Sequence, residues 1–190
     1  MTAQLAPQFI DTRREPAGIL AYRRWVTDHP VSSAILAGLV ATHLATVIGY
    51  WLPGIGLPKL DWNTVNGAVF TPNQSPLVQF VSGGFFHYAD GIVLSVVFAL
   101  LMHPRLPGRN IPRNNLFKGL AFGTLLTVIA LVFMVPRVYL PHVDVGFFSV
   151  HLGWKFLLAV LLWHVVYGIH LGALYNPLPR GESRDTEAGA

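Results

Sequence analysis

Four long runs of apolar residues limit what this chain can fold into. The runs extend roughly from Val31 to Leu52, Pro76 to Met102, Leu116 to Val135 and Val145 to Leu174. A helix of about 20 apolar residues crosses a hydrocarbon layer of about 30 Å, and each run reaches that length. Because backbone polar groups in lipid must be bonded within the chain, the runs predict four transmembrane α-helices and an all-α membrane protein.

The composition agrees with a membrane protein. Only 12% of the 190 residues are Asp, Glu, Lys or Arg, and 53% are hydrophobic. Soluble proteins carry about 25% charged residues, so the composition argues against a soluble enzyme, a disordered protein and a free nucleic-acid binder. The chain has no cysteine, which excludes disulfides, thiolate-bound zinc and a cysteine nucleophile.

The basic residues are distributed unevenly around the four runs. Most of them precede the first run, lie between the second and third, or follow the fourth: Arg13, Arg14, Arg23, Arg24, Arg105, Arg109, Arg113, Lys118, Arg180 and Arg184. The positive-inside rule therefore predicts that both termini are cytoplasmic, in a multi-pass protein of the bacterial inner membrane. We expect an interfacial segment at 1–30, the helical bundle at 31–176 and a solvated cytoplasmic tail at 177–190.

Two halves of the chain share short motifs, which indicates a duplicated helical hairpin. The loops 53–61 and 136–144 both read Pro, Leu, Pro and Asp at the same four positions, ending on Asp61 and Asp144. The second run carries His87-x-x-x-Gly91, and the fourth carries His164-x-x-x-Gly168. We expect repeats at about 33–102 and 118–175, related by a pseudo-twofold axis along the membrane normal. The loop prolines should end the first and third helices, and each loop aspartate should cap the next helix.

This pattern resembles a group of small uncharacterised bacterial four-helix membrane proteins. The likeness rests on the glycines of the first and third helices, the Leu-Pro-x-x-Asp loops and the two His-x-x-x-Gly motifs, and it covers most of 33–176. The chain departs from the group by an insertion at 63–75 and by four further polar residues: His43, His151, Lys155 and His170. The resemblance implies a membrane fold and no particular activity.

His87 and His164 are the first candidates for a functional site. Ionisable residues at membrane depth are costly and usually functional. If the duplication is structural, the two imidazoles face each other across a four-helix bundle, the geometry of a bis-histidine b-type haem, with Gly91 and Gly168 making room for the macrocycle. The alternatives are ligation of another pigment, a histidine that bonds a carbonyl or hydroxyl of the next helix without any cofactor, and proton or metal chemistry.

Five further polar residues fall within the runs: His43, Asp90, His151, Lys155 and His170. On a continuous helix, His151 and Lys155 lie on the face opposite His164, and Lys155 either reaches the outer headgroups or pairs with Asp90. A fourth helix with polar groups on both faces is poorly suited to lipid. Its outer face is therefore expected to contact another protein.

These features favour an accessory subunit of a larger bacterial membrane complex, energy-transducing or oxidative, without catalytic activity of its own. Such a subunit requires no cofactor, and its partners are membrane lipids and other subunits. The first alternative is a b-haem electron-transfer protein that uses His87 and His164, with quinone as a partner. The second is a small transporter, which parallel repeats make less favourable. No nucleic-acid partner is expected, because cytoplasmic arginines near anionic lipids explain the basic pI.

Overall fold

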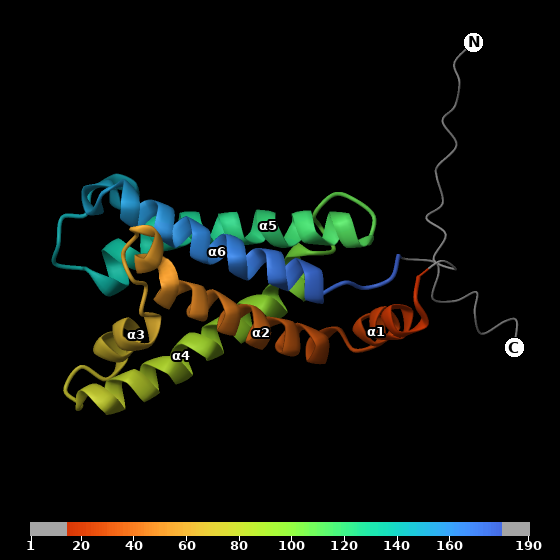
Figure 1. The fold of residues 1–190 in the computed structure, drawn as a ribbon, viewed down its shortest axis with the longest axis horizontal. Helices are drawn as coiled ribbons and strands as arrows, with labels where there is room; N and C mark the ends of the chain where they lie inside the picture. The colour runs from red at the N-terminus through yellow and green to blue at the C-terminus, as the bar shows by residue number, and fades with distance from the viewer. Residues whose placement is uncertain (1–14, 180–190) are drawn as a thin grey trace, which may run out of the picture.

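The computed structural model describes residues 15–179, and this part of the chain is helical without any strand. Four helices, α2 (Pro30–Trp51), α4 (Pro76–Val97), α5 (Pro112–Ile129) and α6 (Trp154–Leu174), account for the membrane-spanning segments (Figure 1). With their extensions the spans are Pro30–Ile55, Pro76–Met102, Pro112–Tyr139 and Trp154–Leu174. The all-α fold with four membrane-spanning helices is confirmed.

Shorter helical elements occupy the two ends of the molecule: α1 (Ala17–Asp28), η2 (Leu52–Ile55), α3 (Trp62–Phe70), η3 (Phe98–Met102), η4 (Ala130–Tyr139) and η5 (Phe147–Leu152). We call the end that carries α1 the terminus end, and the end that carries α3 and η5 the loop end (Figure 1). The insertion at 63–75 is therefore mainly a helix, α3, which packs on α4.

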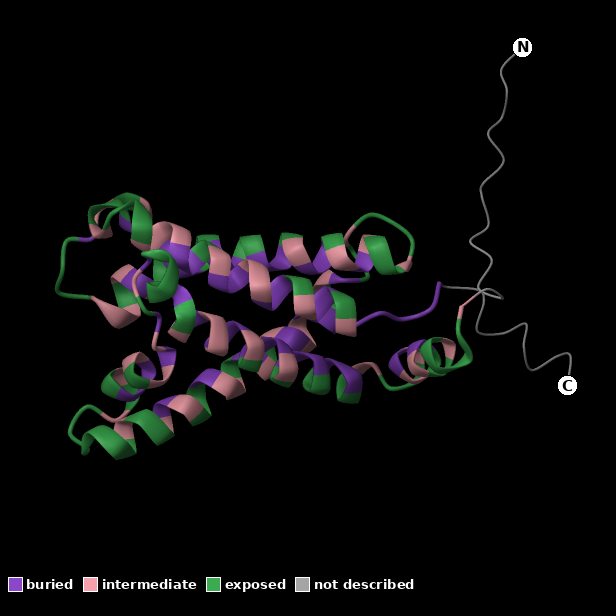
Figure 2. Ribbon diagram, viewed as in Figure 1, coloured by how far each residue is buried: buried purple, intermediate pink, exposed green. Residues whose placement is uncertain are grey.

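The spans form a bundle that is open at the loop end, while at the terminus end the second and third spans meet, with the Phe98 and Phe122 ring centroids 5.2 Å apart. Helices α2 and α6 pack against each other, α4 packs on α2, and α5 packs on α6. Towards the loop end, α4 diverges from α5 and α6 (Figure 1). Figure 2 shows buried residues along the inner faces of α2, α5 and α6, whereas the loop-end half of α4 is mostly exposed. This divergence creates the space in which the candidate site lies.

Glycines set the close approach of helices within each hairpin. A Cβ at Gly91 would overlap the Thr42 hydroxyl on α2, and a Cβ at Gly168 would overlap the Gly119 carbonyl on α5. Small residues allow membrane helices to approach closely where lipid supplies no hydrophobic drive for association. In both hairpins the glycine of the His-x-x-x-Gly motif thus packs on the first helix of the same hairpin, which agrees with the predicted duplication.

Two helix boundaries differ from expectation. Pro136 does not end the third span, because α5 continues through it as the π-helical segment η4. The fourth span begins at Trp154 rather than near Val145: Phe148 and Ser149 have φ of 59° and 55°, and Gly153 has φ of 83°, values that interrupt an α-helix. The residues before Trp154 form the short segment η5 instead.

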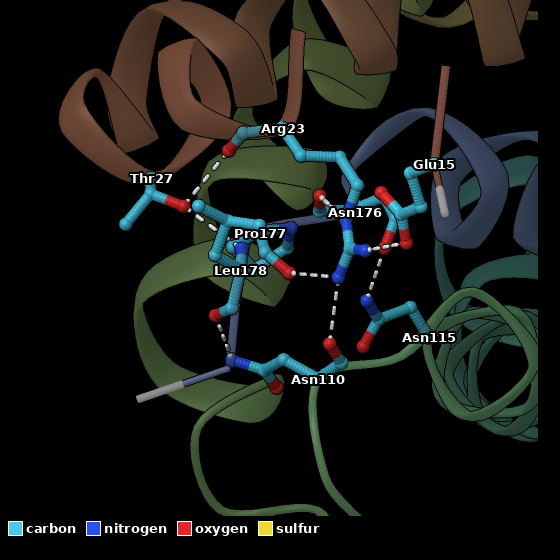
Figure 3. A network of polar contacts seen from close by, with 8 residues as sticks. All are labelled: Glu15, Arg23, Thr27, Asn110, Asn115, Asn176, Pro177 and Leu178. Carbon is cyan, nitrogen blue, oxygen red and sulfur yellow. Dashed lines mark hydrogen bonds and ion pairs between the residues drawn. The ribbon is translucent and has the colours of Figure 1, made fainter. Parts of the chain in front are cut away.

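A buried arginine joins α1 to the chain at the terminus end (Figure 3). Arg23 is 1% exposed and pairs with Glu15. Its Nη2 donates to the carbonyls of Asn110 at 2.8 Å and Pro177 at 3.2 Å, and its Nε donates to that of Asn176 at 3.4 Å. One side chain therefore connects α1, the α4–α5 loop and the segment after α6.

The segment after α6 is packed, contrary to the expectation that the solvated tail begins at Pro177. Residues 175–179 are all buried. The Leu178 N–H donates to the Thr27 hydroxyl at 2.8 Å, and Asn110 Nδ2 donates to the Leu178 carbonyl at 3.3 Å. The extended backbone after α6 finds its hydrogen bonds in α1 and the α4–α5 loop, which explains why it is ordered. The rest of the expected tail lies outside the described residues.

The glycine contacts lead to a test of helix packing. Gly168→Val should destabilise the protein by about 1–3 kcal/mol, because its side chain would meet a backbone carbonyl of α5 that cannot rotate away. The loss of stability is measured as a lower temperature at which the monodisperse peak of the detergent-solubilised protein falls to half its height. Gly18→Ala is the control, since a Cβ at Gly18 has nothing within 4 Å; an equal loss in both variants would contradict the packing.

Arg23→Gln should destabilise the terminus end by about 3–5 kcal/mol, because it leaves the Glu15 carboxylate and three carbonyls without their cationic donor. Limited proteolysis should then cut near 15–30 and 175–179 faster than in the unaltered protein. Arg24→Gln removes the same charge from an exposed neighbouring position. Equal cleavage of the two variants would mean that the buried hydrogen bonds contribute nothing.

Candidate functional site

A cavity of about 320 Å³ lies between helices α4 and α5, with its cover at the loop end. We call it the lateral cavity. Helix α6 contributes its floor, α4 and the α5–η4 segment contribute its walls, and α3 covers it from the loop end. Its lining residues are Trp62, Asn66, His87, Asp90, Gly91, Val93, Leu94, Leu126, Ile129, Ala130, Met134, Tyr139, Trp163, His164 and Tyr167. Mainly apolar walls with a few convergent polar groups are typical of ligand sites.

The lateral cavity opens on the side of the membrane-spanning part. Three of its lining residues, Asp90, Val93 and Ile129, are exposed, and they lie on the facing edges of α4 and α5. All three belong to segments that are long and apolar enough to cross a membrane. The opening therefore faces the hydrocarbon region of the bilayer.

The structure brings His87 and His164 to the same cavity, with different hydrogen bonds. His87 Nε2 lies 3.0 Å from the Thr46 hydroxyl, which itself donates to the Thr42 carbonyl at 2.7 Å. Since the hydroxyl proton is used, His87 Nε2 is the donor, and its Nδ1 is an acceptor. His164 Nδ1 lies 2.8 Å from the Val160 carbonyl and must donate, so its Nε2 is an acceptor. These tautomers are assigned from the hydrogen bonds.

Aromatic rings link the two histidines. The Trp163 ring centroid lies 5.4 Å from that of His87 and 5.0 Å from that of His164. Trp163 also stacks on Tyr167 at 6.1 Å with an interplanar angle of 6°, and it meets the edge of Trp62 at 6.4 Å. The indole N–H groups of Trp62 and Trp163 are buried and have no acceptor within the described residues. An unbonded buried donor is costly, but neither N–H has accessible surface, so neither faces the lateral cavity.

The arrangement does not fit a haem held between the two imidazoles. The space at Gly91 and Gly168 is filled by α2 and α5, so neither glycine leaves room for a macrocycle. His87 Nε2 is bonded to Thr46, and the Trp163 ring lies against both imidazoles. Among residues 15–179, no group of three or more His, Asp or Glu could hold a metal ion. Haem ligation stays a prediction that would require these side chains to rearrange.

The other polar candidates are scattered over the surface. His43 is exposed on α2, and its Nδ1 lies 2.8 Å from the Tyr88 hydroxyl. His170 is half-buried and bonds the Val166 carbonyl of its own helix at 2.7 Å. Neither residue lines the lateral cavity, so only Asp90 of this set joins the two histidines there.

His151 and Lys155 do not lie one turn apart on a single helix, as a continuous span from Val145 would have placed them. His151 is exposed in η5, where its Nδ1 lies 3.5 Å from the Asp144 carboxylate, and Lys155 is exposed in the first turn of α6. Lys155 Nζ lies 5.9 Å from the ring centroid of Trp154. The described residues contain no ion pair between Lys155 and Asp90. The positive φ of Phe148 and Ser149 within η5, and of Gly153 after it, delays the start of α6 to Trp154 and causes the difference.

Sequence reasoning missed the cover of the cavity. Asn66 lies in the insertion, is 1% exposed, and accepts a hydrogen bond from the Tyr139 hydroxyl at 2.9 Å. The bond joins α3 to η4. The available signal for a capped helix at this position was Asp61, which is followed by ten residues without proline.

A model of a family of unknown function matches residues 29–186. The chain belongs to DUF6789. No curated protein and no solved structure matches it. Membership of DUF6789 agrees with the resemblance to uncharacterised membrane proteins, and the match covers all four spans as well as α3.

Asp61 fixes α3 over the cavity in this DUF6789 protein. Its carboxylate caps α3 by accepting from the Thr64 N–H at 3.1 Å, and it also accepts from Tyr50 at 2.8 Å and Lys59 at 3.0 Å. Burial acts to raise the pKa of Asp61, but these hydrogen bonds outweigh burial and hold the pKa below the ordinary value of 3.8. Asp61 thus caps α3, a helix that was not predicted, whereas Ser75 caps the second span. Asp144 bonds the Gly146 N–H at 3.1 Å and caps no α-helix.

The lowered pKa of Asp61 predicts how α3 responds to pH. A carboxyl whose folded pKa is depressed contributes stability above its unfolded pKa and loses it as pH falls through the folded value. Hydrogen-exchange protection of 62–70 should therefore be constant from pH 7 to about pH 5 and fall below about pH 4. Asp61→Ala should lower it about fivefold at pH 7, from loss of a cap worth about 1 kcal/mol. Asp144→Ala should leave it unchanged; equal effects would refute the assignment.

Proposed function

We propose that the protein is an integral-membrane subunit of a larger membrane assembly, with no catalytic role of its own. The observation that carries this proposal is the hydrogen bond between His43 and Tyr88, which lies on the outside of the helices. His43 is at the middle of the span Pro30–Ile55. His43 therefore lies near the centre of the bilayer, where a polar group exposed to lipid is most costly.

A partner helix would relieve that cost. The bond at 2.8 Å occupies only His43 Nδ1, and the ring is exposed. In membrane proteins such residues normally face the bundle interior, a water-filled cavity or another chain. A hydroxyl, amide or carboxyl group on a neighbouring subunit would bond the second ring nitrogen, as interhelical hydrogen bonds do within membranes.

The side chains around this pair provide an apolar contact surface. We call it the outer α2–α4 face; it consists of Leu36, Leu39, His43, Val81, Phe85 and Tyr88. Phe85 is 72% exposed and Val81 is 63% exposed. Aromatic and aliphatic side chains surrounding a polar centre are the composition expected of a packed interface.

This face replaces the fourth helix as the favoured contact. Helix α6 is packed on two sides, by α2 and by α5, whereas α4 is the least buried of the spans. The proposal includes the bacterial cytoplasmic membrane as the location, with cytoplasmic termini, on the argument of the positive-inside rule. The haem and small-transporter alternatives have no comparable support in the geometry.

The test is native electrophoresis after mild solubilisation of the protein from its own membranes. The protein should migrate well above its own mass plus micelle, and His43→Leu and Tyr88→Phe should each release it as a small species. His170→Leu alters a half-buried histidine of α6 and should leave the assembly intact. Release by His170→Leu alone would place the interface on the fourth helix, and a small species for the unaltered protein in every mild detergent would refute the subunit proposal.

A further inference from the structure

We propose that the lateral cavity binds the hydroxylated aromatic head of a membrane-soluble quinol. This inference is independent of the subunit proposal, because the cavity opens between α4 and α5 and includes no residue of the outer α2–α4 face. It concerns binding alone and assigns no redox step to the chain.

The position of the cavity opening favours a ligand that is dissolved in the membrane. The exposed lining residues Asp90, Val93 and Ile129 form the opening at the level of the hydrocarbon layer. On the loop side, α3 closes the cavity with Trp62 and Asn66. A water-soluble ligand would have to cross this cover, whereas a ligand with an apolar tail reaches the opening from the bilayer.

The deep polar groups of the cavity accept hydrogen bonds. His164 uses its Nδ1 proton on the Val160 carbonyl, and His87 uses its Nε2 proton on Thr46. Each imidazole is therefore left with an unprotonated nitrogen and no donor among the described residues. Tyr167 offers no proton either, since its hydroxyl donates to the Gly91 carbonyl at 2.7 Å. A ligand group that donates a hydrogen bond fits these positions.

The two acceptor nitrogens distinguish the reduced from the oxidised form of such a head group. The indole N–H groups of Trp62 and Trp163 are buried away from accessible surface, and the pyrrole edge of Trp163 lies against Gly49 of α2, so these donors do not face a ligand in the cavity. A quinol hydroxyl can donate to an imidazole nitrogen. A quinone carbonyl can only accept and would leave the imidazole nitrogens unbonded, which is costly at a buried site.

The shape of the cavity favours a flat ring. Four aromatic residues, Trp62, Tyr139, Trp163 and Tyr167, line it, and a volume of about 320 Å³ lies at the small end of the range of about 300–1,000 Å³ for ligand pockets. Leu126, Ala130 and Met134 form the apolar wall towards α5 and η4. Met134 is flexible enough to adapt to ring substituents. A single substituted phenol ring fits this setting, with its tail leaving past Val93 and Ile129.

The experiment compares quinol and quinone on the full chain in phosphatidylcholine nanodiscs. Saturable binding of radiolabelled decyl-benzoquinol above that of empty nanodiscs is measured without oxygen, in parallel with decyl-benzoquinone. The quinol should bind at least tenfold more tightly than the quinone and should raise the thermal midpoint of the protein. Equal affinity of the two forms, no saturable quinol binding, or equally tight binding of a decylamine probe would overturn the proposal.

Two variants locate the site. His164→Leu removes the deep acceptor and should weaken quinol binding at least tenfold, and Ala130→Phe should abolish it by filling the cavity. His170→Leu is the matched control: His170 lies on the same helix with the same type of bond to its own backbone, but outside the cavity, so binding should stay within twofold. Equal weakening by His164→Leu and His170→Leu would place the ligand elsewhere. If Ala130→Phe does not fold, the ratio of quinol affinity to quinone affinity of the unaltered protein still tests the proposal.

Discussion

Close packing within each hairpin is the constraint on which the rest of the structure depends. Gly91 lies against Thr42, and Gly168 lies against Gly119, in both cases without space for a side chain. Because α4 is held on α2, and α5 on α6, the second and third spans are not held together by such glycine contacts; they meet at the terminus end, where the Phe98 and Phe122 ring centroids lie 5.2 Å apart. The α4–α5 side of the bundle stays open at the loop end, where larger side chains and α3 surround the lateral cavity instead of filling it.

The cost of polar groups in lipid explains where the remaining interactions lie. At the terminus end, Arg23 and the backbone after α6 satisfy each other, so a cation is buried together with its partners. At the loop end, Asp61 gathers three donors and holds α3 in place. His43 with Tyr88, the cavity histidines and Asp90 stay incompletely bonded at membrane depth within the described part of the chain, and these are the groups that a partner or ligand would complete.

The number of spans could be predicted from the sequence because length and hydropathy indicate them, but the start of the fourth span could not. Asp61 was expected to cap a helix, but the helix that it caps, α3, was not predicted. His87 and His164, which were expected from the sequence to face each other, both line the lateral cavity. The features that could not be predicted depend on backbone conformation and on distant contacts. The positive φ of Phe148 and Ser149 displaces His151 from the fourth helix, and the burial of Leu178 results from hydrogen bonds with Thr27 and Asn110.

The proposed subunit contact and the opening of the lateral cavity lie on different sides of α4. Tyr88 and Asp90 are two residues apart, which turns them about 200° from each other on a helix. A partner that contacts His43 and Tyr88 would therefore leave the opening at Asp90 facing lipid. Because α4 is the least buried span and forms one wall of the cavity, its position depends most on the molecules that cover its outer face. A subunit interface and a lipid-accessible ligand site are thus compatible on one helix, and α4 is the element that connects them.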